Sequence, residues 1–186
     1  MRPVGEIFRL KVTSKEIKEE LTPSFDAVVR SWMGEPVPTR FRDPEYVYNS
    51  TCLTEPLKMF VRGIAEALTI GQPTGGPLER SFGFGKTHAE VLLWHLFNSD
   101  LILRHKELAD LGLTDGTIRG TLVLGLDFRE RKPLSRLIQE LKIYTDPTHP
   151  VSRLKDPKLQ TAVSLILGRR QLGEELMSHE VAELIV

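Results

Sequence analysis

The sequence predicts an α/β fold, in which a small parallel sheet is covered by helices and preceded by a helical N-terminal extension. Three observations lead to this prediction. The short, nearly continuous apolar run at residues 121–126 is typical of a strand that is buried on both faces. Apolar residues recur at helical spacing on both sides of this run, at residues 55–68 and 134–143. A glycine pair, Gly83 and Gly85, comes directly before another helical pattern, as in the turns that join a strand to a helix.

Composition restricts the classes of protein to consider. With 186 residues, of which 40% are hydrophobic and 27% charged, the chain fits one globular domain. The 25 basic and 25 acidic residues cancel, which argues against a dedicated binder of polyanions. Cys52 is the single cysteine and cannot form an internal disulfide, so a reducing compartment is the default. Because residues 1–12 carry scattered charges and no segment is long and apolar enough to span a bilayer, we expect a soluble cytoplasmic protein with no membrane partner.

Residues 1–50 are predicted to form the helical extension and a connector. Apolar residues in the segment 13–33 have helical spacing, and Thr22 with Pro23 resembles an N-cap and first turn, so we expect two short helices there. Gly34 ends the second helix. Two prolines follow it closely, which predicts an extended connector over residues 34–50.

Residues 51–186 are predicted to form the second unit, which holds the sheet. Its clearest helix is capped by Thr54 and runs to about Leu68. A second helix is expected from Lys86 to Phe97. Strands are expected near Leu78 and at 121–126, with further helices at 134–143, 158–167 and 171–185.

The glycine pair belongs to the sequence Arg-Ser-Phe-Gly-Phe-Gly-Lys-Thr-His at residues 80–88, whose second half matches a phosphate-binding loop. Glycines let backbone N–H groups approach phosphate oxygens, and a helix N-terminus adds free N–H groups and a favourable dipole. Lys86 would reach the β- and γ-phosphates of ATP, and the Thr87 hydroxyl would bind Mg²⁺. The predicted nucleotide-binding residues are Ser81, Phe82, Gly83, Phe84, Gly85, Lys86, Thr87 and His88.

Two readings of this loop stay open. The full pattern has glycine where this chain has Arg80, and Gly75, Gly76 and Pro77 occupy the place of the strand that should precede the loop. The alternative is a glycine turn that begins a helix with a solvated lysine. In that case the chain is a non-catalytic interaction module with a degenerate phosphate loop.

A second metal ligand is predicted at Asp127, which ends the apolar run. An acid at the end of a strand beside a phosphate loop can hold the water shell of Mg²⁺. Phe128 stands where catalysis would favour a glutamate. The alternative for Asp127 is a strand-end residue that caps a turn.

Four blocks of sequence carry a family resemblance. They are residues 42–51, 53–57, 78–88 and 92–96, and in order and spacing they resemble the start of the domain-of-unknown-function family four-nine-nine. That resemblance implies a P-loop ATPase of the AAA+ type, so the sheet would be P-loop NTPase-like, with ATP and Mg²⁺ as cofactors. Arg80 and Phe84 depart from the family pattern, and we expect these departures to affect the affinity for the nucleotide more than the fold. The chain after Thr87 is short for a complete AAA+ module, so we expect a truncated or partial member.

The predicted binding partners come from the family resemblance more than from individual residues. It implies a homo-oligomer or other subunits, hydrolysis only when another chain supplies the missing parts, and work connected with nucleic acid or defence. The basic residues of the C-terminal third, such as Arg129, Arg131 and Lys132, are interspersed with acids and read as solvated helix faces. No clear recognition helix for DNA is found.

Overall fold

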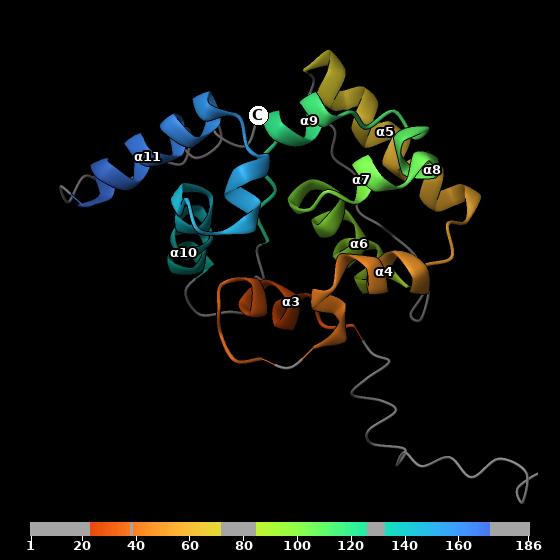
Figure 1. Ribbon diagram of the computed structural model, residues 1–186, viewed down its shortest axis with the longest axis horizontal. Helices are drawn as coiled ribbons and strands as arrows, with labels where there is room; N and C mark the ends of the chain where they lie inside the picture. Colours follow the sequence, from red (N-terminus) through yellow and green to blue (C-terminus); the bar gives the residue numbers. More distant parts are fainter. Residues whose placement is uncertain (1–22, 38, 72–84, 126–132, 172–186) are drawn as a thin grey trace, which may run out of the picture.

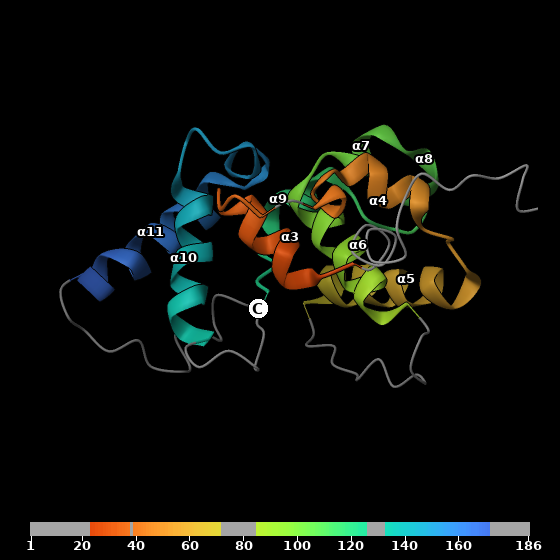
Figure 2. The same ribbon diagram turned by 90° about the horizontal axis from the view of Figure 1, so that it is seen from below.

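The computed structural model of the chain describes residues 23–37, 39–71, 85–125 and 133–171 (Figure 1). These residues form helices separated by short turns, with α5 and α11 at opposite sides of the molecule (Figures 1 and 2). The elements in chain order are α3 (Phe25–Trp32), η1 (Arg40–Arg42), α4 (Pro44–Ser50), α5 (Glu55–Ile70), α6 (Lys86–Asn98), α7 (Leu101–Arg104), α8 (Lys106–Ala109), α9 (Asp115–Gly120), α10 (Pro133–Thr145), η2 (Pro150–Leu154) and α11 (Pro157–Gln171).

The predicted α/β fold with a parallel sheet is wrong for this part of the chain. The described residues contain no β-strand and are about 72% helical. The predicted strand near Leu78 lies outside the described residues. The apolar run does pass through the interior, because Leu122 is buried, but residues 121–125 have no neighbouring strand among the described residues.

Side chains take the place of a strand ladder along residues 121–125. The Thr121 carbonyl accepts a hydrogen bond from Lys155 Nζ at 2.6 Å, and the Val123 carbonyl accepts one from the Tyr144 hydroxyl at 2.6 Å. The Gly125 N–H donates to Glu140 Oε2 at 2.8 Å. Buried backbone groups need partners, and here α10 and the residue after η2 supply them. The segment is therefore extended and buried without being part of a sheet.

Two hydrophobic clusters hold the described residues together. The larger is centred on α6, whose residues 91–98 are buried apart from the half-buried Leu93, and it includes residues of α3, α4, α5 and α9. The smaller joins Leu122 to α10, η2 and α11. Trp32, at the end of α3, packs against both clusters. Residues before and after position 50 share the larger cluster, and the division of the chain at that position stays a prediction.

Several helices agree with the sequence pattern. α5 begins after Thr54 and ends at Gly71, which has the left-handed φ of 67° that favours glycine. α6 and α10 extend the predicted helices by only one or two residues at their ends. α11 runs through Gly168, where a break was expected, and the predicted helix 171–185 lies beyond the described residues apart from Gln171.

The predicted connector over residues 34–50 is wrong in its second half. Asp43 caps α4, since its side chain accepts a hydrogen bond from the Glu45 N–H at 3.0 Å, and Pro44 occupies the first helical position. This is an ordinary helix-start signal that the preceding prolines obscured. Thr114 likewise caps the short α9, since its side chain accepts a hydrogen bond from the Thr117 N–H. Within the described residues, no helix combines the length and the apolar character needed to cross a membrane.

Candidate phosphate-binding site

The predicted loop enters the described part of the chain at Gly85, which is the N-cap of α6. Gly85 has φ 71° and ψ 24°, the left-handed conformation that side chains disfavour. It is exposed, and a Cβ atom built on it would meet nothing within 4 Å. Its carbonyl accepts from the Ala89 N–H at 2.9 Å, which is the first hydrogen bond of the helix. The conformation of the backbone, and not a lack of space, is thus what requires glycine at this position.

Lys86 and Thr87 are the first two residues of α6, and both are half-buried. The N–H groups of a first helical turn have no acceptor within the helix, and glycine has no side chain with which to cap them. Further along, the helix is buried in the larger cluster and so is held rigidly. Lys86 and Thr87 therefore begin a well-packed helix, at the end where the helix dipole favours an anion.

His88 is turned toward the end of α4. Its Nε2 lies 2.7 Å from Thr51 Oγ1, and that hydroxyl lies 2.6 Å from the Val47 carbonyl. Only the hydroxyl can donate to the carbonyl, so Thr51 accepts from His88, and Nε2 carries the hydrogen. The Phe41 ring packs edge-to-face against the His88 ring, with 5.7 Å between the two centroids. Burial lowers the pKa of His88, against a smaller raising effect of the Val47 carbonyl.

His95, two turns further along α6, makes a second attachment to the same segment. Its Nε2 lies 2.7 Å from the Phe41 carbonyl, to which it donates, and the side chain is fully buried. Burial lowers the pKa of His95 to about 4, so the ring is neutral at pH 7. This geometry gives His95 a packing role. Together the two histidines fasten α6 to the segment that contains η1 and α4.

Part of the predicted site cannot be placed. Ser81, Phe82, Gly83 and Phe84 lie outside the described residues, as does the predicted metal ligand Asp127. Of the predicted metal ligands, Thr87 alone is described, and no group of three or more His, Cys, Asp or Glu side chains could hold a metal ion in the described ranges.

The segment before Asp127 runs alongside α6 in the opposite direction. Near Thr121, Lys155 Nζ bridges to the carbonyl of Phe97, close to the C-terminus of α6. At the other end of the segment, Gly125 lies against Phe25, whose ring meets Trp94 at a centroid distance of 5.9 Å. From Thr121 to Gly125 the chain thus moves from the end of α6 toward its middle.

A buried charge cluster anchors the end of this segment. Glu140 is fully buried and accepts from the Gly125 N–H. Arg136 Nε lies 3.3 Å from Glu140 Oε1, and the same guanidinium pairs with Asp26 of α3. Removing one partner of such a buried pair leaves an uncompensated charge, so the cluster fixes the position of Gly125 relative to α3 and α10.

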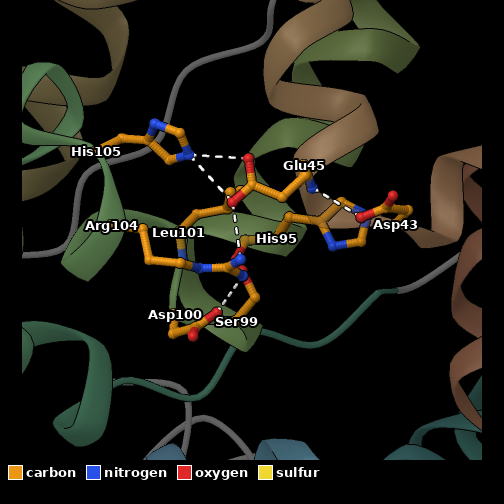
Figure 3. A network of polar contacts seen from close by, with 8 residues as sticks. All are labelled: Asp43, Glu45, His95, Ser99, Asp100, Leu101, Arg104 and His105. Atoms are coloured by element: carbon orange, nitrogen blue, oxygen red, sulfur yellow. Dashed lines mark hydrogen bonds and ion pairs between the residues drawn. The ribbon is translucent and has the colours of Figure 1, made fainter.

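A second polar network lies on the other side of α4 (Figure 3). Glu45 accepts from Arg104 at 2.8 Å and from His105 Nε2 at 2.9 Å, and Arg104 also pairs with Asp100. The His105 ring stacks on the Tyr48 ring at a centroid distance of 3.9 Å. The network ties α4 to α7.

Sequence reasoning missed the residues that position α6 and the 121–125 segment. Thr51, Glu140 and Lys155 all act over long separations in the chain, and nothing in their local sequence marks them. Lys155 was read with the solvated basic residues, yet it is 4% exposed and lies over the Tyr144 ring. Burial lowers the pKa of Lys155 to about 7.

Comparison of the chain with models of protein families, with curated proteins and with solved structures finds no match. The family resemblance of the four sequence blocks therefore stays a prediction.

Proposed function

We propose that the chain binds ATP with Mg²⁺, and that the phosphates lie at the N-terminus of α6. The observation that carries this proposal is the start of the helix, where a left-handed glycine precedes Lys86 and Thr87. Backbone N–H groups of the first turn would donate to phosphate oxygens. Lys86 would neutralise phosphate charge, and the Thr87 hydroxyl would be a ligand of the metal.

The packing around α6 supports the proposal. A phosphate site needs a helix start that does not move when the anion arrives, because ordering it on binding would reduce affinity. Here His88 and His95 attach the helix to η1 and α4. The contact of His88 with Thr51 directs the His88 side chain to the end of α4.

The direction of residues 121–125 supports a place for Asp127 in the same site. The segment runs from the C-terminal end of α6 toward its middle, and Asp127 follows its last described residue by two positions. We propose that Asp127 approaches the metal from this side. We propose binding only and not hydrolysis, because none of the residues discussed here orients an attacking water.

A Lys86→Ala variant tests the proposal. At about one hundred times its dissociation constant, Mg-ATP should stabilise the wild-type chain by roughly 2.7 kcal/mol. For a chain of this size that corresponds to a rise in Tm of about 5 to 10 °C. Lys86→Ala should reduce the rise to near zero, since it removes the ammonium group from the helix start.

The matched control is Lys106→Ala. Lys106 is also the first residue of a helix, α8, and it is exposed. Its removal should leave the ATP-induced rise in Tm unchanged. If the wild-type chain shows no rise at millimolar Mg-ATP, or if both variants lose the rise equally, the proposal is wrong.

The second candidate function is a non-catalytic interaction module. The observation in its favour is the all-helical character of the described residues, because phosphate loops of P-loop proteins follow a strand of a sheet. Absence of any response to ATP in the same experiment would favour this candidate.

A further inference from the structure

The solvent-facing side of α5 has features that the contacts among the described residues do not explain. Both views place α5 at the edge of the molecule (Figures 1 and 2). We call its side formed by Met59, Arg62, Gly63, Glu66 and Ile70 the α5 outer face. These residues recur at spacings of three and four and so lie on one side of the helix. Met59 and Ile70 are each 69% exposed, the highest values among the large apolar side chains described.

Gly63, in the middle of the α5 outer face, has no role in the contacts among the described residues. A glycine in a helix interior is less favourable than alanine by about 1 kcal/mol. Its conformation is an ordinary helical one, and a Cβ atom built on it would meet nothing within 4 Å. Glycine at such a position lets a second helix approach the backbone closely. No contact among the described residues requires glycine at this position.

Arg62 and Glu66 flank Gly63, and neither forms an ion pair within the described part of the chain. Both are exposed. Some other exposed arginines form ion pairs, such as Arg119 with Asp115 at 2.7 Å. In that pair the acid precedes the base by four residues, whereas Arg62 precedes Glu66, which is the less favourable order within one helix. Their charges are available to a partner.

A hollow of about 440 Å³ lies beside the α5 outer face. It is formed between the C-terminal half of α5 and the turn after α8. Arg62, Glu66 and Ile70 contribute to its wall together with Leu111. A flexible apolar side chain from a partner could fill it.

We propose that the α5 outer face binds the same face of a second copy of this chain, with the two helices antiparallel about a two-fold axis near Gly63. In this arrangement Arg62 lies opposite the partner's Glu66, and Glu66 lies opposite the partner's Arg62. Met59 meets the partner's Ile70 beside the hollow, and the two glycines allow close approach. A parallel arrangement would place like charges opposite one another, so charge complementarity selects the antiparallel one.

The size of the α5 outer face sets the strength of this dimer. A helix of 16 residues is about 24 Å long. One helix pair buries less surface than the roughly 1,200 Å² of a stable interface. We therefore expect a dimer that depends on concentration, with a dissociation constant on the order of micromolar. The inference is independent of ATP binding.

Charge reversal tests the dimer and its register. The mass of the full chain is measured by sedimentation equilibrium from about 1 to 200 µM, a range set by the expected dissociation constant. Arg62→Glu alone and Glu66→Arg alone should each weaken the homodimer at least about tenfold, because each places like charges opposite one another twice. The double variant should restore the dimer. An equimolar mixture of the two single variants should form a heterodimer, since every opposed pair is then complementary.

Arg153→Glu is the control for the change in net charge, because Arg153 is exposed and lies in η2, away from α5. It should leave the dissociation constant unchanged. A wild-type chain that stays monomeric over the whole concentration range would overturn the proposal. In that case the α5 outer face does not bind a second copy, even if it binds another protein. Failure of the mixture to associate, or single-variant dimers as strong as the wild-type dimer, would overturn it as well.

Discussion

At the scale of single residues, the described structure depends on polar side chains that are buried with specific partners. His95 is the clearest case. It is neutral because burial lowers its pKa to about 4, and its Nε2 donates to the Phe41 carbonyl. The unfolded chain binds a proton on this residue near the ordinary pKa of about 6.5, so it holds more protons than the folded chain between these two values.

The contribution of the neutral His95 side chain to the free energy of unfolding should therefore be fully present above pH 6.5 and should fall as the pH decreases toward 4. The loss attributable to His95 should be on the order of 3 kcal/mol. Urea denaturation at pH 7, 5 and 4 measures it, with His95→Gln as the comparison, because glutamine can donate to the same carbonyl without titrating. If the variant and the wild type lose stability in parallel, the buried neutral histidine is not the cause.

Lys155 is the second residue whose burial has a measurable consequence. Its ammonium group donates to two carbonyls, those of Phe97 and Thr121. Lys155→Met keeps the apolar part of the side chain but leaves both carbonyls without this donor, which should cost about 2 kcal/mol of the free energy of unfolding. Lys158→Met, at an exposed position of α11, should change it by less than about 0.5 kcal/mol. Equal effects of the two substitutions in urea denaturation would refute the role of Lys155.

At the scale of elements, helices with a strong apolar periodicity could be predicted from the sequence. The side chains that form hydrogen bonds with the backbone of a buried segment could not. α5 and α6 were predicted because each has an apolar stripe and a definite start signal. The run at 121–126 was read as a strand because a short apolar run looks the same whether its backbone partners are another strand or buried side chains. Glu140, Tyr144 and Lys155 satisfy it here, and their sequence positions give no sign of that role.

Two glycine substitutions test whether the end of the 121–125 segment passes close to α3. A Cβ atom on Gly125 would lie 2.6 Å from the Phe25 ring, so Gly125→Ala must displace the ring or the segment and should destabilise the chain by about 1 to 3 kcal/mol. Gly120→Ala, in α9, meets nothing within 4 Å and should be neutral or slightly stabilising. Thermal unfolding of the two variants gives the comparison. Similar Tm values would mean that the segment does not pass so close to α3.

At the scale of the whole molecule, the predicted sheet is wrong for the described residues, and the nucleotide site at the start of α6 stays a prediction. Gly85, Lys86 and Thr87 begin a helix as the Gly-Lys-Thr pattern indicates. The contact of His88 with Thr51 joins residues 37 positions apart and could not be read from local pattern. The described residues surround this helix with other helices in place of the predicted sheet. The ATP proposal therefore rests on the helix start, with the packing of α6 and the direction of residues 121–125 in support.

The most direct test is to observe the amide groups at that helix start while ATP is added. Backbone ¹H–¹⁵N spectra of the labelled chain, titrated with Mg-ATP, should show the largest and saturable shifts at Gly85, Lys86 and Thr87, and Lys86→Ala should abolish them. If these amides stay unchanged at millimolar Mg-ATP, or if the largest shifts arise at residues remote from α6, the phosphates do not bind at this helix and the central claim is wrong.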